Sequence, residues 1–402
     1  ELSHRITGRQ TDLFIEDIQD HSQELQSKIQ STRILVIGGA GSIGSSTIRA
    51  ILPYKPKTLH VVDQNENGLA ELVRDLRSSF PILEIEDFRT LPLDFGSPVM
   101  QRFLLDSPPY DYVLNFAALK HVRSEKDTYS LLQLLDTNII KPARFLHWLA
   151  DQNHPLRYFC VSTDKAANPV NFMGASKRAM ERLIFSDEII ASGKITMSSA
   201  RFANVAFSQG SLLDSFLIRM QKQQPLAVPE HTRRFFLSMR ESGQICLLAT
   251  FCAADKQIFV PRLSPDSDLI LLEQVACRIL ESQGYIPRIY RNESDVKKNL
   301  YDGSKNKEYP LLLTPLDTSG EKSYEEFVGQ GEIENDIGMK SVLSVSYRHD
   351  GHGSMNQFLE TISDWISHPS QNLTKEDLRK LLDSIVPQFH HRETHKNLDQ
   401  RM

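Results

Sequence analysis

The sequence predicts an α/β protein with a Rossmann-type, doubly wound parallel sheet and a smaller α+β substrate-binding cap. In the first half of the chain, short β-rich runs alternate with amphipathic helical patterns, which is typical of a parallel sheet. A glycine-rich loop directly follows the first of these runs, and an aspartate ends the second. After about Ala203 the pattern changes to shorter elements separated by charged, turn-rich segments.

Composition limits the classes of partner. The chain has 402 residues, 40% of them hydrophobic, and a net charge of −5, which argues against a broad nucleic-acid-binding surface. No apolar run reaches the length of a membrane span, and the first residues do not resemble a signal peptide. The four cysteines form no CxxC pair and are interpreted as free thiols. We therefore expect a cytoplasmic protein.

The predicted elements divide the chain into three parts. Residues 1–32 form a helical arm, packed on the domain or on another subunit. Residues 33–203 form the dinucleotide-binding domain, and residues 204–402 form mainly the cap and a C-terminal helical tail, with some segments returning to the main sheet. The expected strands are Arg33–Ile37, Thr58–Val62, Tyr112–Phe116, Leu156–Val161 and Ile195–Phe202, and the expected helices are Ser42–Leu52, Glu66–Ser79, Leu131–Asp151 and Asn171–Ser192.

The glycine loop predicts a dinucleotide site. Gly38, Gly41 and Gly44 follow the first strand and open a helix, so the backbone can turn tightly and approach a pyrophosphate. The first residues of that helix, Ser42 and Ile43, then offer N–H groups to the phosphates.

Two aspartates are candidates for the adenosine half of the cofactor. Asp63 ends the second strand, where a carboxylate accepts hydrogen bonds from ribose hydroxyls and repels a 2′-phosphate, which favours NAD over NADP. A helix cap or turn residue is the alternative. Asp94 follows a third expected strand and is a candidate for the adenine amino group, or else a turn aspartate. Ala117 and Ala118 follow the fourth strand and either let the cofactor pass or serve ordinary packing.

The most informative segment is Ser162-Thr163-Asp164-Lys165, which follows the fifth strand. The next helix carries Met173 and Lys177 four residues apart, hence on one helical face. That face looks into the crevice at the carboxyl ends of the strands.

These motifs, taken in order, resemble the nucleotide-sugar 4,6-dehydratases of bacterial polysaccharide biosynthesis, within the extended short-chain dehydrogenase/reductase superfamily. Methionine stands where that superfamily has its catalytic tyrosine, and a thioether cannot exchange a proton. The combination of Thr-Asp-Lys with Met-x-x-x-Lys is similar to the retaining UDP-N-acetylglucosamine 4,6-dehydratases. The segments 317–322 and 389–394 resemble the legionaminic-acid branch.

The resemblance implies a role for each residue of the motif. NAD takes a hydride from sugar C4, water is eliminated across C5 and C6, and the hydride returns to C6. Asp164 is the expected acid toward O6, and Lys165 is the expected base at C5, provided that its pKa is lowered. Lys177 should hold the nicotinamide ribose, and Thr163 the 4-oxygen. The alternative is a surface Asp–Lys pair.

The same resemblance points to further binding residues. Asn138 is assigned to the cofactor. The side chains expected at the substrate are Lys120, His121, Asn204 and Arg233, although a solvated Lys-His pair and a structural role for either Arg233 or Arg234 are the alternatives. The histidine-rich tail, with His390, His391, His395 and Glu393, lacks metal-site spacing, so no metal is predicted.

Three other functions stay open on the sequence. A C4-epimerase, an inverting 4,6-dehydratase and a non-catalytic nucleotide-sugar-binding regulator all fit the fold. The regulator would explain Met173, but Asp164, Lys165 and Lys177 are all present. UDP is favoured over GDP on the substrate by resemblance alone, and a homo-oligomer is expected.

Overall fold

The main sheet is the nine-stranded framework of the molecule. The computed structural model describes residues 2–79, 85–120, 125–187, 194–298, 307–316, 322–347, 353–368 and 372–391. Within them the sheet has the order β15-β16-β11-β6-β5-β4-β1-β2-β3, parallel except where β16 pairs with β11 and β15. Its strands are β1 (Arg33–Ile37), β2 (Thr58–Val62), β3 (Asp87–Leu91), β4 (Tyr112–Asn115), β5 (Leu156–Val161), β6 (Ile195–Ala200), β11 (Gln257–Pro261), β15 (Glu334–Asp336) and β16 (Val342–Ser346).

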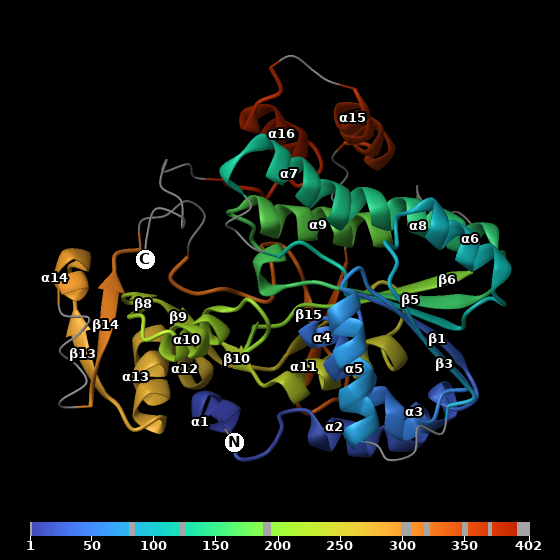
Figure 1. Cartoon of the computed structure of the whole chain (residues 1–402). Helices are drawn as coiled ribbons and strands as arrows, with labels where there is room; N and C mark the ends of the chain where they lie inside the picture. The colour runs from blue at the N-terminus through green and yellow to red at the C-terminus, as the bar shows by residue number, and fades with distance from the viewer. Residues whose placement is uncertain are drawn as a thin grey trace.

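Helices cover both faces of this sheet (Figure 1). One face carries α6 (Pro98–Asp106), α7 (Thr128–Leu135), α8 (Lys141–Asp151) and α9 (Phe172–Phe185), and the other carries α4 (Ser42–Ile51), α5 (Glu66–Ser79) and α11 (Met239–Phe251). The predicted doubly wound α/β fold is therefore confirmed. Strands β1, β2 and β5 and helix α5 have the predicted limits, because their apolar patterns end at clear turn residues.

Two predicted helices differ in detail. The helix expected over Leu131–Asp151 begins at Thr128 and includes a π-helical segment, Asp136–Ile140, between α7 and α8. Such segments insert one extra residue per turn and often mark functional sites. The helix expected to reach Ser192 ends at Phe185, and residues 188–193 lie outside the described part of the chain.

The cap is a separate small layer with its own apolar core. Its sheet has the parallel order β13-β14-β8, covered by α13 (Leu272–Ser282). Helix α1 (Leu2–Thr7) contacts α13, and Ile6 is buried there, so the N-terminal arm packs on its own chain. The remaining cap elements are β7 (Asn204–Val205), α10 (Leu212–Gln221), β8 (Leu226–Pro229), β9 (Arg233–Arg234), β10 (Phe236–Leu237), α12 (Pro265–Asp268), β12 (Ile270–Leu271), β13 (Ile286–Tyr290), α14 (Glu293–Lys298) and β14 (Glu308–Thr314).

Segments from both ends of the chain pack on the first domain. Strands β11, β15 and β16 extend the main sheet, and α2 (Ile15–Asp20) and α3 (Ser22–Ile29) pack on α11. Helices α15 (Met355–Ser367) and α16 (Lys375–Asp383) lie over α7 and α9 at the top of Figure 1. Among the described helices, none combines the length and the apolar character that a bilayer crossing requires.

The packing of α11 on α4 depends on one glycine. A Cβ on Gly243 would lie 2.5 Å from the carbonyl oxygen of Ser46, so Gly243→Ala forces the two helices apart. Overpacking costs about 1–3 kcal/mol, which outweighs a helix-propensity gain of about 1 kcal/mol. We expect a lower melting temperature by circular dichroism, whereas Arg240→Ala, at a position whose side chain is 79% exposed in the same helix, should leave it nearly unchanged. Equal melting temperatures for all three proteins would contradict the assigned packing.

Candidate active site

The glycine loop lies against the end of β4. Gly38 has a φ of +73°, and a Cβ there would lie 2.6 Å from the backbone nitrogen of Ala117. A Cβ on Gly44 would lie 2.4 Å from the Gly38 carbonyl oxygen. Gly41 occupies the N-cap position of α4 and has no side chain with which to cap the first-turn N–H groups. The loop therefore fits a pyrophosphate at the helix N-terminus.

Asp63 and Asp94 both take part in turns. The Asp63 carboxylate accepts hydrogen bonds from the backbone nitrogens of Ala40 (3.0 Å) and Asn65 (2.9 Å), so it also braces the glycine loop. Asp94 pairs with Lys141 Nζ at 2.6 Å. Burial raises the pKa of Asp94, but the hydrogen bond and charge of Lys141 outweigh it and hold that pKa below its usual value. Ribose and adenine contacts for these residues stay predictions.

Asn138 connects the loop after β4 to α9. Its Oδ1 accepts a hydrogen bond from the Leu119 nitrogen (2.9 Å), and its Nδ2 donates to the Leu119 carbonyl (2.9 Å) and to Ser176 Oγ (3.0 Å). The π-helical segment carries this buried side chain. Asn138 thus positions Ala117 and Ala118, which come just before Leu119, whatever contact it makes with a cofactor.

Thr163, Asp164 and Lys165 cluster at the carboxyl end of β5, where a short 3-10 turn spans Asp164–Ala166. Asp164 is 2% exposed. Its Oδ1 accepts hydrogen bonds from Thr163 Oγ1 (2.8 Å), the Lys165 backbone nitrogen (2.9 Å) and Lys165 Nζ (3.0 Å). Asp164 is therefore buried and directly hydrogen-bonded to Lys165, whose side chain is 19% exposed, so the two do not form a solvated surface pair.

The charge state of Lys165 corrects one expectation. Burial by itself lowers the pKa of Lys165, but the negative charges of Asp164 and Glu325 outweigh burial and raise it. The lowered pKa that a lysine base requires is thus absent in this structure. Lys165 must lose a proton to a neighbouring group before it can remove one from a substrate.

Lys177 and Met173 lie on the first turns of α9. Lys177 Nζ donates to the Val161 carbonyl (2.9 Å) at the end of β5, and desolvation lowers its pKa. The Met173 nitrogen donates to Glu125 Oε1 (3.0 Å), and the Met173 side chain belongs to the apolar cluster formed with α7, α15 and α16. Met173 therefore offers packing at the position where a tyrosine would offer a hydroxyl.

The predicted substrate residues have different surroundings. Lys120 Nζ donates to the Gln209 carbonyl (3.0 Å), and the Gln209 nitrogen donates to Ser42 Oγ (2.8 Å), so Lys120 lies beside the glycine-loop helix. His121 lies outside the described residues. Asn204 Nδ2 is buried without a hydrogen-bond partner among the described residues. Because buried donors are usually hydrogen-bonded, this amide group is available to donate to a ligand.

Of the adjacent arginines, Arg234 is the one directed to the cluster. Arg233 is exposed, whereas the charge of Arg234 acts on both Lys165 and Glu325. Nη1 of Arg234 also donates to the carbonyls of Lys322 (3.0 Å) and Ser323 (3.1 Å). The prediction of Arg233 as a substrate ligand thus stays untested, and Arg234 joins the candidate residues.

Residues 322–332 run past the 3-10 turn and complete the cluster. Asn168 is their anchor: its Nδ2 donates to Glu326 Oε2 (2.7 Å), its Oδ1 accepts from the Gln330 nitrogen (2.9 Å), and its carbonyl accepts from Lys322 Nζ (2.5 Å). Glu325, 3% exposed, is thereby placed with its Oε1 3.9 Å from Lys165 Nζ. The sequence analysis did not identify Glu325.

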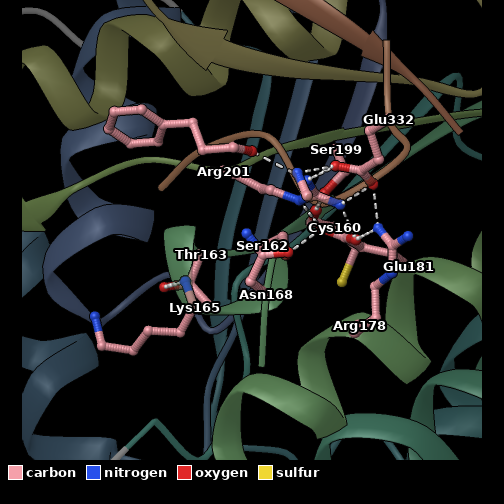
Figure 2. A network of polar contacts seen from close by, with 12 residues as sticks. Cys160, Ser162, Thr163, Lys165, Asn168, Arg178, Glu181, Ser199, Arg201 and Glu332 are labelled. Carbon is pink, nitrogen blue, oxygen red and sulfur yellow. Dashed lines mark hydrogen bonds and ion pairs between the residues drawn. The ribbon is translucent and has the colours of Figure 1, made fainter. Parts of the chain in front are cut away.

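A buried network of four charges holds the other end of this segment (Figure 2). Arg201 uses its five N–H groups toward Glu181, Glu332 and the Phe327 carbonyl, at 2.6–3.0 Å. Arg178 pairs with both glutamates, and Ser162 Oγ donates to Glu181 Oε1 (2.6 Å). The network thus joins β5, β6 and α9 to residues 327–332, while Lys165 extends away from it.

The tail packs near the same region. The His390 nitrogen donates to the Pro169 carbonyl (3.1 Å), and the His391 ring contacts Phe172. His395 and Glu393 lie outside the described residues, as do residues 317–321 of the branch motif. The described histidines therefore bring the tail onto the loop that precedes α9.

Comparison with known proteins gives one family and several relatives. The model of the family described as "Polysaccharide biosynthesis protein" matches residues 34–346. An uncharacterized membrane protein of Methanocaldococcus jannaschii is 30% identical over 90% of this chain and 98% of its own length. A Campylobacter jejuni UDP-N-acetylglucosamine 4,6-dehydratase (inverting) is 28% identical over 57% of this chain and 66% of its own. A Rickettsia massiliae UDP-glucose 4-epimerase is 24% identical over 87% and 94%.

Solved structures support the same fold. Pen from Bacillus thuringiensis superposes with a TM-score of 0.64 at 22% identity, covering 90% of this chain and 98% of that one. The chain spans only about half the length of two other relatives, a probable polysaccharide biosynthesis protein of Bacillus subtilis (52%) and a capsular polysaccharide biosynthesis protein of Staphylococcus aureus (54%).

The network makes a stability prediction. Burial raises the pKa of Glu332, but the hydrogen bonds and charge of Arg201 outweigh burial and hold that pKa at about 2, against about 4.3 for a free glutamate. A carboxyl group whose pKa is lowered in the folded protein stabilises the fold at pH values above its unfolded pKa. This stabilisation disappears as the pH falls toward 2. Glu332→Gln should cost on the order of 3–5 kcal/mol at pH 7.

Urea unfolding from pH 7 to pH 3 checks this sign. The difference between wild type and Glu332→Gln should shrink below about pH 4.3, and the exposed neighbour Glu334 supplies the matched control, Glu334→Gln. A difference that is constant across this range would show that Glu332 is not ionised in the network.

Proposed function

Since this chain belongs to the polysaccharide biosynthesis protein family, we propose that it is an NAD-dependent 4,6-dehydratase of a nucleotide-linked N-acetylglucosamine. The substrate carries UDP, with GDP as the alternative. The product is the 4-keto-6-deoxy sugar with retained configuration at C5, used for a bacterial surface glycan or a nonulosonic acid of the legionaminic type. One observation carries the proposal: the hydrogen-bonded Asp164–Lys165 pair, with Asp164 buried, follows β5 beside a helix that has Met173 in place of tyrosine.

The cofactor is NAD. Gly38, Gly41 and Gly44 leave room for the pyrophosphate, Asp63 takes the adenosine ribose, and Lys177, four residues after Met173, takes the nicotinamide ribose. Ser42, Ile43, Asp94, Ala117, Ala118 and Asn138 complete the set assigned to it. When bound, NAD supplies reversible hydride acceptance, so the cofactor is unchanged after each turnover. Solved NAD(H) complexes of Bordetella bronchiseptica WbmF, which share this fold, support that choice.

The side chains divide the elimination between them. Asp164 gives a proton to the departing O6, and Lys165 removes the C5 proton that the 4-ketone has acidified. Because Asp164 Oδ1 and Lys165 Nζ are 3.0 Å apart, the two groups can act on neighbouring sugar atoms. Thr163, hydrogen-bonded to Asp164, holds the 4-oxygen. The Asn204 amide, with its unused donor, binds the diphosphate together with Arg233, while Lys120 and His121 face the sugar.

A C4-epimerase is the second candidate, because relatives named UDP-glucose 4-epimerase match 87% of the chain. An epimerase needs no acid toward O6, so the Asp164–Lys165 pair would have no role in its reaction. An inverting dehydratase, the function named for the Campylobacter relative, uses the same elimination but returns the C5 proton on the other face. A non-catalytic regulator would bind the sugar without turnover.

The cellular setting completes the proposal. Cys160, Cys246, Cys252 and Cys277 are free thiols, which supports a reducing, cytoplasmic environment. The expected homo-oligomer stays a prediction that light scattering of the purified protein measures.

The product tests the proposed function. Incubation with UDP- or GDP-N-acetylglucosamine, without added cofactor, should yield a sugar nucleotide lighter by one water, because the elimination removes H from C5 and OH from C6. NMR couplings should identify the D-xylo hexulose early in the time course. An unchanged mass with inverted C4 would establish the epimerase instead. An early L-arabino product would refute retention while keeping dehydration.

Asp164 and Lys165 should each be required for elimination. Asp164→Asn and Lys165→Ala should reduce product formation about 100-fold or more, the range for a positioned acid or base. Cofactor content and melting temperature should stay close to wild type. Near-normal turnover of either variant would remove that residue from the mechanism.

A further inference from the structure

Glu325 is a buried carboxyl group that lies close to the Asp164–Lys165 pair. Its Oε1 lies 3.9 Å from Lys165 Nζ, and its Oε2 lies 3.8 Å from Lys322 Nζ. Lys165 Nζ thus lies near two carboxyl groups, 3.0 Å from Asp164 and 3.9 Å from Glu325. Arg233 and Arg234 form β9 beside this segment.

The two carboxyl groups have unequal surroundings. Asp164 Oδ1 accepts three hydrogen bonds, one of them from the ammonium group of Lys165. Glu325 Oε2 is buried and accepts no hydrogen bond from the described residues. An unpaired buried carboxylate oxygen is costly, and protonation of Glu325 relieves that cost.

The charges around Glu325 act in both directions. Burial and the negative charge of Asp164 raise the pKa of Glu325, and they outweigh the positive charges of Lys165 and Lys322 and that of Arg234 on β9. A carboxyl group whose pKa is raised is a better proton acceptor than an exposed glutamate.

Resting on the proposed dehydration, we propose that Glu325 is a positioning residue that acts through Lys165 by taking the proton that its ammonium group must lose. An Nζ–H bond of Lys165 breaks and an Oε1–H bond of Glu325 forms, leaving the electron pair on nitrogen. The 3.9 Å contact shortens by about 1 Å to reach hydrogen-bond range in the complex with substrate.

The amine then removes the C5 proton. The electron pair of the C5–H bond becomes the second C5–C6 bond, the C6–O6 bond breaks, and O6 leaves as water with a proton from Asp164. Asp164 receives that proton from the 4-hydroxyl during oxidation at C4, through Thr163 Oγ1, which lies 2.8 Å from Asp164 Oδ1. When Lys165 later returns a proton to C5, Glu325 gives its proton back to the amine. Glu325 therefore gains and loses one proton in each turnover. Asp164 cannot serve in its place, because it must carry a proton for O6 at the same moment.

Glu325→Gln with Glu334→Gln as its control tests the inference on the whole chain. Glu334 is an exposed glutamate on β15, outside the 322–332 segment. Oxidation at C4 is followed by the near-ultraviolet absorbance of the reduced cofactor, and elimination by product formation, each from pH 6 to pH 10. Glu325→Gln should oxidise C4 normally but eliminate water about 100-fold more slowly at pH 7.

The shape of the pH profile carries the decision. In wild type the elimination rate should be flat at neutral pH and fall on the acid side as Glu325 becomes protonated. In Glu325→Gln only solvent takes the Lys165 proton, so the rate should climb toward pH 10. If Glu325→Gln kept the shape of the wild-type pH profile at a lower rate, or lost no more activity than Glu334→Gln, the inference would be overturned.

A second variant tests the inference if Glu325→Gln destabilises the fold. If Glu325→Gln melts early, Glu325→Asp keeps the carboxyl group on a shorter side chain and should retain the acid limb at a reduced rate; an aspartate variant without that limb would overturn the inference. A wild-type protein that forms no water-loss product refutes the proposed function itself. A wild-type dehydratase whose Glu325→Gln variant keeps the same profile refutes only the role of Glu325.

Discussion

The buried guanidinium of Arg201 is the constraint on which the candidate site depends. It is 0% exposed, and a cation in that position is tolerable only when every N–H group has an acceptor. Glu181 comes from α9, whereas Glu332 and the Phe327 carbonyl come from a segment far along the chain. Satisfying one arginine therefore fixes the 327–332 segment against β6 and α9.

That constraint is transmitted to the chemistry through a short stretch of backbone. Phe327, held by Arg201, is two residues from Glu325, and Asn168 holds the same segment three residues after Lys165. The acid–base cluster is thus assembled from two pieces of chain that the network and Asn168 clamp together. Loss of the network would then disturb both the stability of the fold and the spacing of the charges around Lys165.

The sequence predicts most of the fold, because the signals for it are local. Strands such as Arg33–Ile37 are bounded by turn residues, and their alternation with helices implies a parallel sheet. The motif residues Thr163 to Lys165 could also be predicted, because they directly follow a strand. Glu325 could not be predicted, because it lies outside any helix or strand. The contact that anchors its segment joins Asn168 and Glu326, which are 158 residues apart.

Two further features of the site could not be determined from the sequence, for physical reasons. Arg233 and Arg234 are adjacent on a two-residue strand, where successive side chains point to opposite faces, and sequence alone does not say which face meets the site. The pKa of Lys165 depends on the charge of Glu325 as well as that of Asp164, so a lowered value could not be judged without the fold.

The most direct measurement of the central claim, that this cluster eliminates water across C5 and C6, is turnover in deuterium oxide followed by NMR. Removal and return of the C5 proton should place a single deuterium at C5 of a 4-keto-6-deoxy sugar. A product that keeps its original C5 proton and its C6 hydroxyl would contradict the account.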